Sequence, residues 1–184
     1  MVKLRPGRCV RKINSQAWSR YSLRKPKKNY VKALPRTSLL IFNMGARDKA
    51  FDTIFTLTAK RDIQLRSNSL EAARQAANKY LERELANAYF MRMVAYPHNV
   101  IREKKFATGA GADRISQGMT LSFGRPSAVA ARVRTGQTVI EVKTNIVNRK
   151  VAKEALKRAS SKLSGDFAII TKETAVQAKV ASAA

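Results

Sequence analysis

Hydrophobic and polar residues follow two different spacings between residues 38 and 172. Apolar side chains recur at three- and four-residue steps over residues 68–85 and 149–162, which is the spacing of one helix face. Shorter runs are rich in β-branched and aromatic residues and are bounded by turn-forming residues, as strands are. These strand candidates are residues 38–42, 53–59, 89–96, 119–123, 128–134, 138–144 and 167–170. Many strands with two main helices predict an α+β fold with a mostly antiparallel sheet in a sandwich-like arrangement.

Each predicted helix has an apolar stripe. In the first helix Asn68 or Ser69 can cap the first turn, and Glu71 is placed favourably for the helix dipole. The stripe of this helix consists of Leu70, Ala73, Ala77, Tyr80 and Leu81. The stripe of the second helix, which faces away from basic residues, consists of Val151, Ala155, Ala159 and Leu163.

Proline and glycine residues mark turns between the strand candidates. Pro97 ends the strand of residues 89–96 before apolar residues resume. Gly136 can supply the positive φ of a tight turn. We therefore expect residues 128–134 and 138–144 to form a hairpin.

Three parts of the chain differ in composition. Residues 1–37 contain twelve Lys and Arg and no acidic residue, since the first acidic residue is Asp48. Prolines exclude a long helix there, and like charges with few aliphatic side chains predict an arm that is poorly ordered by itself. Residues 38–172 are expected to form one globular domain. Residues 173–184 form a tail without a clear burial pattern.

The charge of the chain predicts a polyanionic partner. There are 37 Lys and Arg against 12 Asp and Glu, a formal net charge of +25, and self-repulsion at this level favours binding to a polyanion. The charges are spread along the whole chain rather than beside an apolar helix, which favours nucleic acid over a membrane surface.

The N-terminal arm has the residue types that follow an RNA backbone. Guanidinium and ammonium groups bind phosphates, and the interleaved Trp18, Tyr21 and Tyr30 can stack on bases. RNA fits better than duplex DNA, because the sequence contains no helix-turn-helix signature, basic heptad region or zinc finger. The candidate phosphate contacts are Arg5, Arg8, Arg11, Lys12, Arg20, Arg24, Lys25, Lys27 and Lys28.

The glycine-rich stretch of residues 106–118 does not match a phosphate-binding loop. A P-loop would continue with Lys and Ser or Thr, but Gly118 is followed by Met119, and a dinucleotide fingerprint would need glycine in place of Arg114. His98 is the only histidine and Cys9 the only cysteine, which argues against a catalytic relay, a metal site or an intrachain disulfide. We therefore expect no cofactor and no metal. The sequence also shows neither an apolar membrane span nor a signal peptide.

Several motifs occur in one order along nearly the whole chain. They are "RPGRC" (5–9), "SLEAARQAANKYL" (69–81), "YPHNVIRE" (96–103), "ATGAGADRISQGM" (107–119), "SFGRP" (122–126) and "AARVRTGQ" (130–137). Together they resemble the universal large-subunit ribosomal protein sixteen family, in its archaeal and eukaryotic "ten-e" branch and on the archaeal side of it. Arg125 stands where this family often has lysine, which keeps the charge, and it joins the candidate RNA contacts.

The resemblance implies a role for the glycine-rich stretch. It implies a non-enzymatic protein in the cytoplasmic ribosome, one copy in each, held in large-subunit rRNA between the central protuberance and the stalk base, beside neighbouring ribosomal proteins. It also implies that residues 102–118 form an extended loop that reaches toward the peptidyl transferase centre and the tRNA acceptor arms. The candidate loop residues are Arg102, Lys104, Lys105, Gly109, Gly111, Asp113, Arg114, Ser116 and Gln117.

Within this loop the residue types have distinct expected roles. Glycine lets the backbone approach RNA closely, the basic residues can hold phosphates, and the Ser and Gln side chains can hydrogen-bond sugars or bases. Asp113 is expected to order the loop by pairing with a nearby Arg or backbone amide.

Two other classes of protein remain open at this stage. An RNA-modifying or RNA-processing enzyme would need a cofactor loop, paired carboxylates or an activated nucleophile, and none is legible in the sequence. A nucleoid-type DNA binder would bind duplex DNA and structured RNA with similar affinity. Co-sedimentation with the large subunit at moderate salt would separate both from a ribosomal protein.

Overall fold

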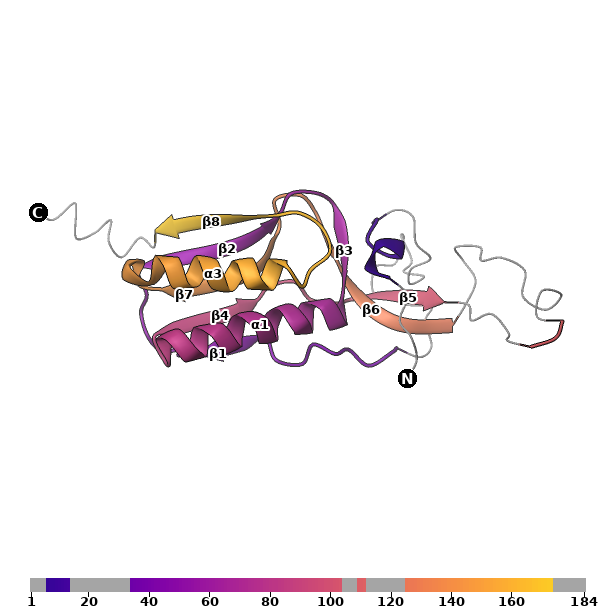
Figure 1. Cartoon of the computed structure of the whole chain (residues 1–184), viewed down its shortest axis with the longest axis horizontal. Helices are drawn as coiled ribbons and strands as arrows, with labels where there is room; N and C mark the ends of the chain where they lie inside the picture. Colours follow the sequence, from indigo (N-terminus) through magenta and orange to yellow (C-terminus); the bar gives the residue numbers. More distant parts are fainter. Residues whose placement is uncertain (1–5, 14–33, 104–108, 112–124, 174–184) are drawn as a thin grey trace, which may run out of the picture.

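The computed structural model describes residues 6–13, 34–103, 109–111 and 125–173. Figure 1 shows two helices lying over one face of a larger sheet, with a smaller sheet at one end of the molecule. The predicted α+β fold with antiparallel sheets is confirmed. The predicted strand of residues 119–123 lies outside the described residues.

The larger sheet has five antiparallel strands in the order β1-β4-β7-β2-β8. Their bounds are Asn43–Gly45 for β1, Thr53–Ala59 for β2, Tyr89–Met93 for β4, Thr138–Thr144 for β7 and Phe167–Glu173 for β8. The register aligns buried Phe55, Val142 and Met91 in one row. Because side chains alternate along a strand, the neighbouring row projects from the opposite face of the sheet.

Two helices, α1 (Ser67–Leu85) and α3 (Arg149–Ser160), cover the apolar face of this sheet. Buried alanines of both helices belong to one core cluster, and such small side chains let packed backbones approach closely. The buried residues are Ser67, Leu70, Ala73, Ala77 and Leu81 on α1, and Ala152, Ala155, Leu156 and Ala159 on α3. Most of both predicted stripes is therefore confirmed, since Ala155, Ala159 and Leu163 of the second stripe are also buried. Val151 is only partly buried, and Ala152 and Leu156 are buried in addition to the predicted residues.

Two details at the ends of the helix stripes differ from expectation. Tyr80 is half-buried, with the guanidinium carbons of Arg158 and Arg83 at 3.9 and 5.4 Å from its ring centre. Helix α1 begins one residue earlier than predicted and has no side-chain cap. Glu71 consequently lies beyond the first turn, where it accepts hydrogen bonds from Arg74.

The smaller sheet has three antiparallel strands in the order β3-β6-β5. Their bounds are Ile63–Arg66 for β3, Asn99–Glu103 for β5 and Arg125–Val133 for β6. Strand β3 was not predicted, because it is only four residues long and continues into α1 without a turn residue. The break at Pro97 is confirmed, since β4 and β5 lie on either side of it in different sheets.

The predicted hairpin around Gly136 is wrong. Gly136 does have a positive φ of 78°, but the strands on either side of it pair in different sheets, Val133 with Ile63 and Thr138 with Thr58. The turn instead passes from the small sheet to the large one. Hydrogen bonds from the backbone N–H and the hydroxyl of Thr135 to Asp62, at 2.8 and 2.9 Å, hold the turn against the β2–β3 connection.

The predicted strand of residues 38–42 is displaced along the chain. The first strand of the large sheet is Asn43–Gly45, and just before it the Phe42 carbonyl oxygen accepts a hydrogen bond from the Met93 N–H at 2.8 Å. Leu39 is fully buried, whereas Leu40 and Ile41 are exposed. The apolar run therefore serves as a lead-in segment with one buried anchor.

Candidate nucleic-acid interface

The described part of the N-terminal arm is folded against the small sheet. Residues Gly7–Cys9 form a short 3₁₀ helix, η1, and the next residue, Val10, is buried against Ile101 of β5 and Ala130 of β6. We expected an arm that is poorly ordered by itself, but residues 6–13 are folded against the small sheet, because Val10 supplies an apolar anchor. Residues 14–33 lie outside the described residues.

A buried amide network fixes this segment. Gln64 on β3 is only 1% exposed. Its side-chain Nε2 donates a hydrogen bond to the Val10 carbonyl oxygen at 2.9 Å. Its backbone N–H donates to the Arg11 carbonyl at 2.7 Å, and its Oε1 accepts from Asn99 Nδ2 at 2.6 Å. Because every one of these groups is buried or part of the backbone, the network positions the segment strongly.

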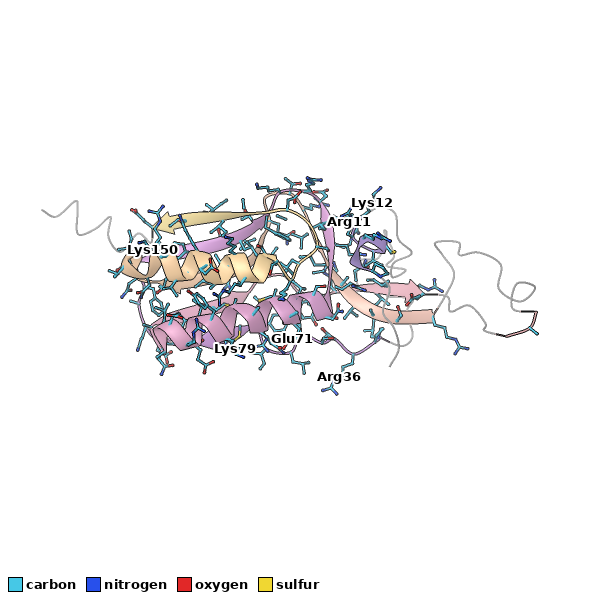
Figure 2. All side chains as sticks on the ribbon, viewed as in Figure 1. Arg11, Lys12, Arg36, Glu71, Lys79 and Lys150 are labelled. Atoms are coloured by element: carbon cyan, nitrogen blue, oxygen red, sulfur yellow. The ribbon has the colours of Figure 1, made fainter. Side chains whose placement is uncertain are left out.

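Three of the candidate RNA contacts, Arg8, Arg11 and Lys12, project from this anchored segment and are exposed. Figure 2 shows Arg11 and Lys12 beside η1, close to β3. Arg11 and Lys12 line a shallow hollow together with Arg61, Asp62, Ile63, Gly165 and Asp166. The structure thus gathers basic side chains there that are far apart in sequence.

The acidic residues of this hollow already have partners. Asp166 forms an ion pair with Arg61. Hydrogen bonds from Thr135, the backbone N–H first, lower the pKa of Asp62 below its usual value. Both carboxylates therefore hold neighbouring parts of the protein together, while Arg11 and Lys12 add positive charge at the rim of the hollow.

The long loop starts and ends on the small sheet. Glu103 at the end of β5 pairs in register with Arg125 at the start of β6, and Arg102 pairs with Pro126. Arg125 is exposed and Arg102 is half-buried. The two predicted contacts that flank the loop are therefore side by side at its base.

Within the loop, Gly109 and Gly111 are exposed and have φ values of +134° and +75°. A Cβ added to either would meet no described atom within 4 Å, so the backbone conformation, rather than crowding, accounts for glycine at these positions. The other candidate contacts lie outside the described residues: Arg5, Arg20, Arg24, Lys25, Lys27, Lys28, Lys104, Lys105, Asp113, Arg114, Ser116 and Gln117.

Sequence reasoning missed a second basic hollow, on the face of the large sheet opposite the helices. Its cations come from the β1–β2 connection and from two strands that are distant in sequence. No charge run marked them, because strand residues that share a face are separated by residues of the other face. The hollow is lined by Asn43, Arg47, Lys49, Ala50, Phe51, Ile54, Phe90, Arg92 and Lys143.

Residues considered for other chemistry have ordinary surroundings. His98 Nδ1 lies 3.0 Å from the Tyr96 carbonyl oxygen, and Cys9 is exposed. Within the part of the chain that the structure describes, no three His, Cys, Asp or Glu side chains are grouped to hold a metal ion. A search of the same residues finds no helix long and apolar enough to cross a bilayer.

Comparison with known proteins agrees with the motifs. The family described as "Ribosomal protein L16p/L10e" matches residues 18–170. A protein named "Large ribosomal subunit protein uL16" from Thermofilum pendens is 43% identical over 163 residues, covering 88% of this chain and 93% of the relative. The proteins of the same name from Methanococcus aeolicus and Sulfolobus acidocaldarius are 43% and 40% identical, over 88% and 96% of this chain and 90% and 100% of theirs.

These matches decide between the classes that the sequence left open. They span most of the chain and include the strands of both sheets and the two helices. The alternative of an RNA-modifying or RNA-processing enzyme is wrong, because the matched family consists of non-enzymatic structural proteins. The chain belongs to the ribosomal protein L16p/L10e family.

Proposed function

We propose that this protein is a structural component of the large ribosomal subunit that binds rRNA through the small sheet and its arm. In this proposal the loop of residues 102–118 extends from the same sheet toward the peptidyl transferase centre and the tRNA acceptor arms. Neighbouring ribosomal proteins complete its surroundings, and the particle holds one copy.

One observation carries the proposal: the arm and the loop share a platform. Val10 of the arm packs on Ile101 and Ala130, and the residue after Ile101 is Arg102, which lies near the end of β5 at the base of the loop. Phosphates bound by Arg8, Arg11 and Lys12 would therefore hold the small sheet in place. A rigid base would in turn fix the direction in which the loop extends, since binding loops are commonly positioned by a rigid scaffold.

The charge balance supports RNA as the partner of this end. Arg8, Arg11 and Lys12 are exposed, and the nearby acidic residues are engaged with Arg61 and Thr135. Guanidinium groups bind phosphate oxygens in a bidentate manner, which suits a backbone contact.

The experiment that tests this function replaces residues 106–118 with a short Gly-Ser linker. Large subunits should still incorporate the shortened protein, because the platform is intact, but they should bind tRNA more weakly than wild-type subunits. A second comparison uses particle structures, in which the loop density should be stronger with tRNA bound than without it. Unchanged tRNA binding, or equal loop density in both states, would contradict the role of the loop.

A further inference from the structure

The second hollow lies on the outer face of the large sheet, where helices α1 and α3 are absent. The strand register builds its floor: Ile54, Lys143 and Phe90 stand in one row across β2, β7 and β4. At the next position on β1, Gly45 adds no side chain, so the row ends at Phe90. The β1–β2 connection contributes the wall, and its Phe51 is 8% exposed.

Four cations line this hollow: Arg47, Lys49, Arg92 and Lys143. The lining contains no carboxylate, since Asp48 and Asp52 of the same connection are not part of it. Charges of one sign in a concave surface concentrate the potential and attract a polyanion.

One acidic residue on the same face of the sheet contacts two of these cations. Glu141 is 13% exposed in its side chain and lies 3.3 Å from Arg92 and 3.5 Å from Lys143. A single carboxylate shared between two cations offsets only one charge. Glu141 therefore orients Arg92 and Lys143 and leaves the hollow with a positive excess.

The hollow also offers an aromatic surface. The Phe90 ring is half-buried, and Lys143 Nζ lies 5.9 Å from its centre. An aromatic ring next to several cations is the combination by which proteins hold a nucleotide, with the base against the ring and the phosphate on the cations. An acidic peptide would use the cations but would leave the ring without a planar partner.

We propose that this outer-face hollow binds a segment of rRNA, with phosphate held by Arg47, Lys49 and Arg92 and a base or ribose against Phe90. The inference rests on the proposed function, and it adds a second RNA surface, on a different sheet from the arm and loop platform. The protein is then held by RNA on two sides rather than at one end.

The test uses the full chain with Arg47→Gln and Lys49→Gln together, because both side chains are exposed and neither is part of the sheet. The matched control is Lys79→Gln with Arg83→Gln on α1, a helix whose three basic residues are balanced by three acidic ones. Thermal unfolding first verifies that both variants are folded. Association with large-subunit rRNA is then measured over a range of salt concentrations.

The expected result is a loss of roughly tenfold in affinity for Arg47→Gln/Lys49→Gln, with a plot of log K against log salt shallower by about 1.5 to 2, since each lost phosphate contact removes almost one from the slope. The control should change the affinity less than twofold. A wild-type chain that does not bind rRNA would overturn the proposed function itself. If the wild type binds rRNA and Arg47→Gln/Lys49→Gln binds it with the same affinity, this inference alone is overturned.

A crosslinking measurement identifies the occupant in assembled subunits. Ala50 is exposed and lines the hollow, so p-benzoylphenylalanine in its place puts a photoreactive group at the site. Recovery of a crosslink to rRNA supports the proposal. A crosslink to a neighbouring protein, or the absence of any crosslink to RNA, overturns it.

Discussion

The side-chain Nε2 of Gln64 lies 2.9 Å from the carbonyl oxygen of Val10, and this bond fastens the N-terminal segment to strand β3. The oxygen of the same amide accepts from Asn99 on β5 at 2.6 Å. Gln64 thus connects the arm, the strand before α1 and the strand that leads into the long loop. The position of the arm and the geometry of the loop base depend on one buried amide.

We predict that Gln64→Leu destabilises the protein by about 2 kcal/mol, because it leaves buried polar groups of Val10 and Asn99 without their partner. Urea unfolding measures the loss. The variant should also be cut faster by trypsin after Arg11, since the segment is released. Lys79→Ala, an exposed change on α1, is the control and should leave both unchanged. Wild-type stability and cleavage in Gln64→Leu would show that the network does not hold the arm.

Gly45 and Gly136 form a matched pair for a second prediction. Their φ values are +83° and +78°, but a Cβ on Gly45 would lie 2.3 Å from the Tyr89 carbonyl oxygen, whereas one on Gly136 would meet nothing within 4 Å. Gly136→Ala should cost about 1 kcal/mol from the backbone conformation alone. Gly45→Ala should cost roughly 2–5 kcal/mol, because the β1–β4 pairing must also shift. Equal losses in chemical denaturation would contradict this packing of β1.

The Glu71–Arg74 pair gives a prediction about pH. The hydrogen bonds of Arg74, then that of Gln75, lower the pKa of Glu71 below its ordinary value of 4.5. A lowered pKa in the fold means that the stabilisation is present above this ordinary value and is lost as the pH falls through the folded value. The side chains are 19% and 12% exposed, and the pair should contribute about 1 kcal/mol.

Glu71→Gln tests this by removing the charge while keeping the shape of the side chain. Urea midpoints of the wild type should fall more than those of the variant as the pH drops from above 4.5 through the lowered pKa of Glu71, since only the wild type loses the ion pair. Parallel declines in the two proteins would mean that other carboxylates account for the acid sensitivity.

The anchored arm segment should contribute measurably to RNA binding. We predict that Arg11→Gln with Lys12→Gln weakens binding to rRNA fragments of every sequence tested. The slope of log K against log salt should become shallower by about 2, as for two lost phosphate contacts. Thermal unfolding should be unchanged, because both side chains are exposed. The α1 variant Lys79→Gln with Arg83→Gln serves again as the charge-matched control. A loss no larger than that of this control would remove Arg11 and Lys12 from the interface.

Local periodicity predicted the long elements well and the pairing of strands poorly. Helix α1 is 19 residues long, so its apolar stripe repeats over several turns and is legible in the sequence. The turn at Gly136 was also legible, but its assignment to a hairpin was wrong, because tertiary contacts such as Thr135 with Asp62 decide which sheet a strand joins.

The candidate site was predictable only where basic residues are close together in the sequence. Arg8, Arg11 and Lys12 belong to a visibly basic arm. The structure adds the buried anchor Val10, which the sequence did not predict because a single apolar residue among basic ones has no recognisable pattern. The outer-face hollow could not be read from the sequence. Arg47 and Lys143 are almost a hundred positions apart, and only the strand register brings their elements together.

The salt dependence of full-length protein binding to large-subunit rRNA tests most directly whether RNA offsets the net charge of +25. If about ten phosphates are contacted, log K should fall with log salt at a slope of roughly −7 to −9. A slope near zero, with the same weak affinity for rRNA and for an uncharged polymer, would contradict an RNA-held protein.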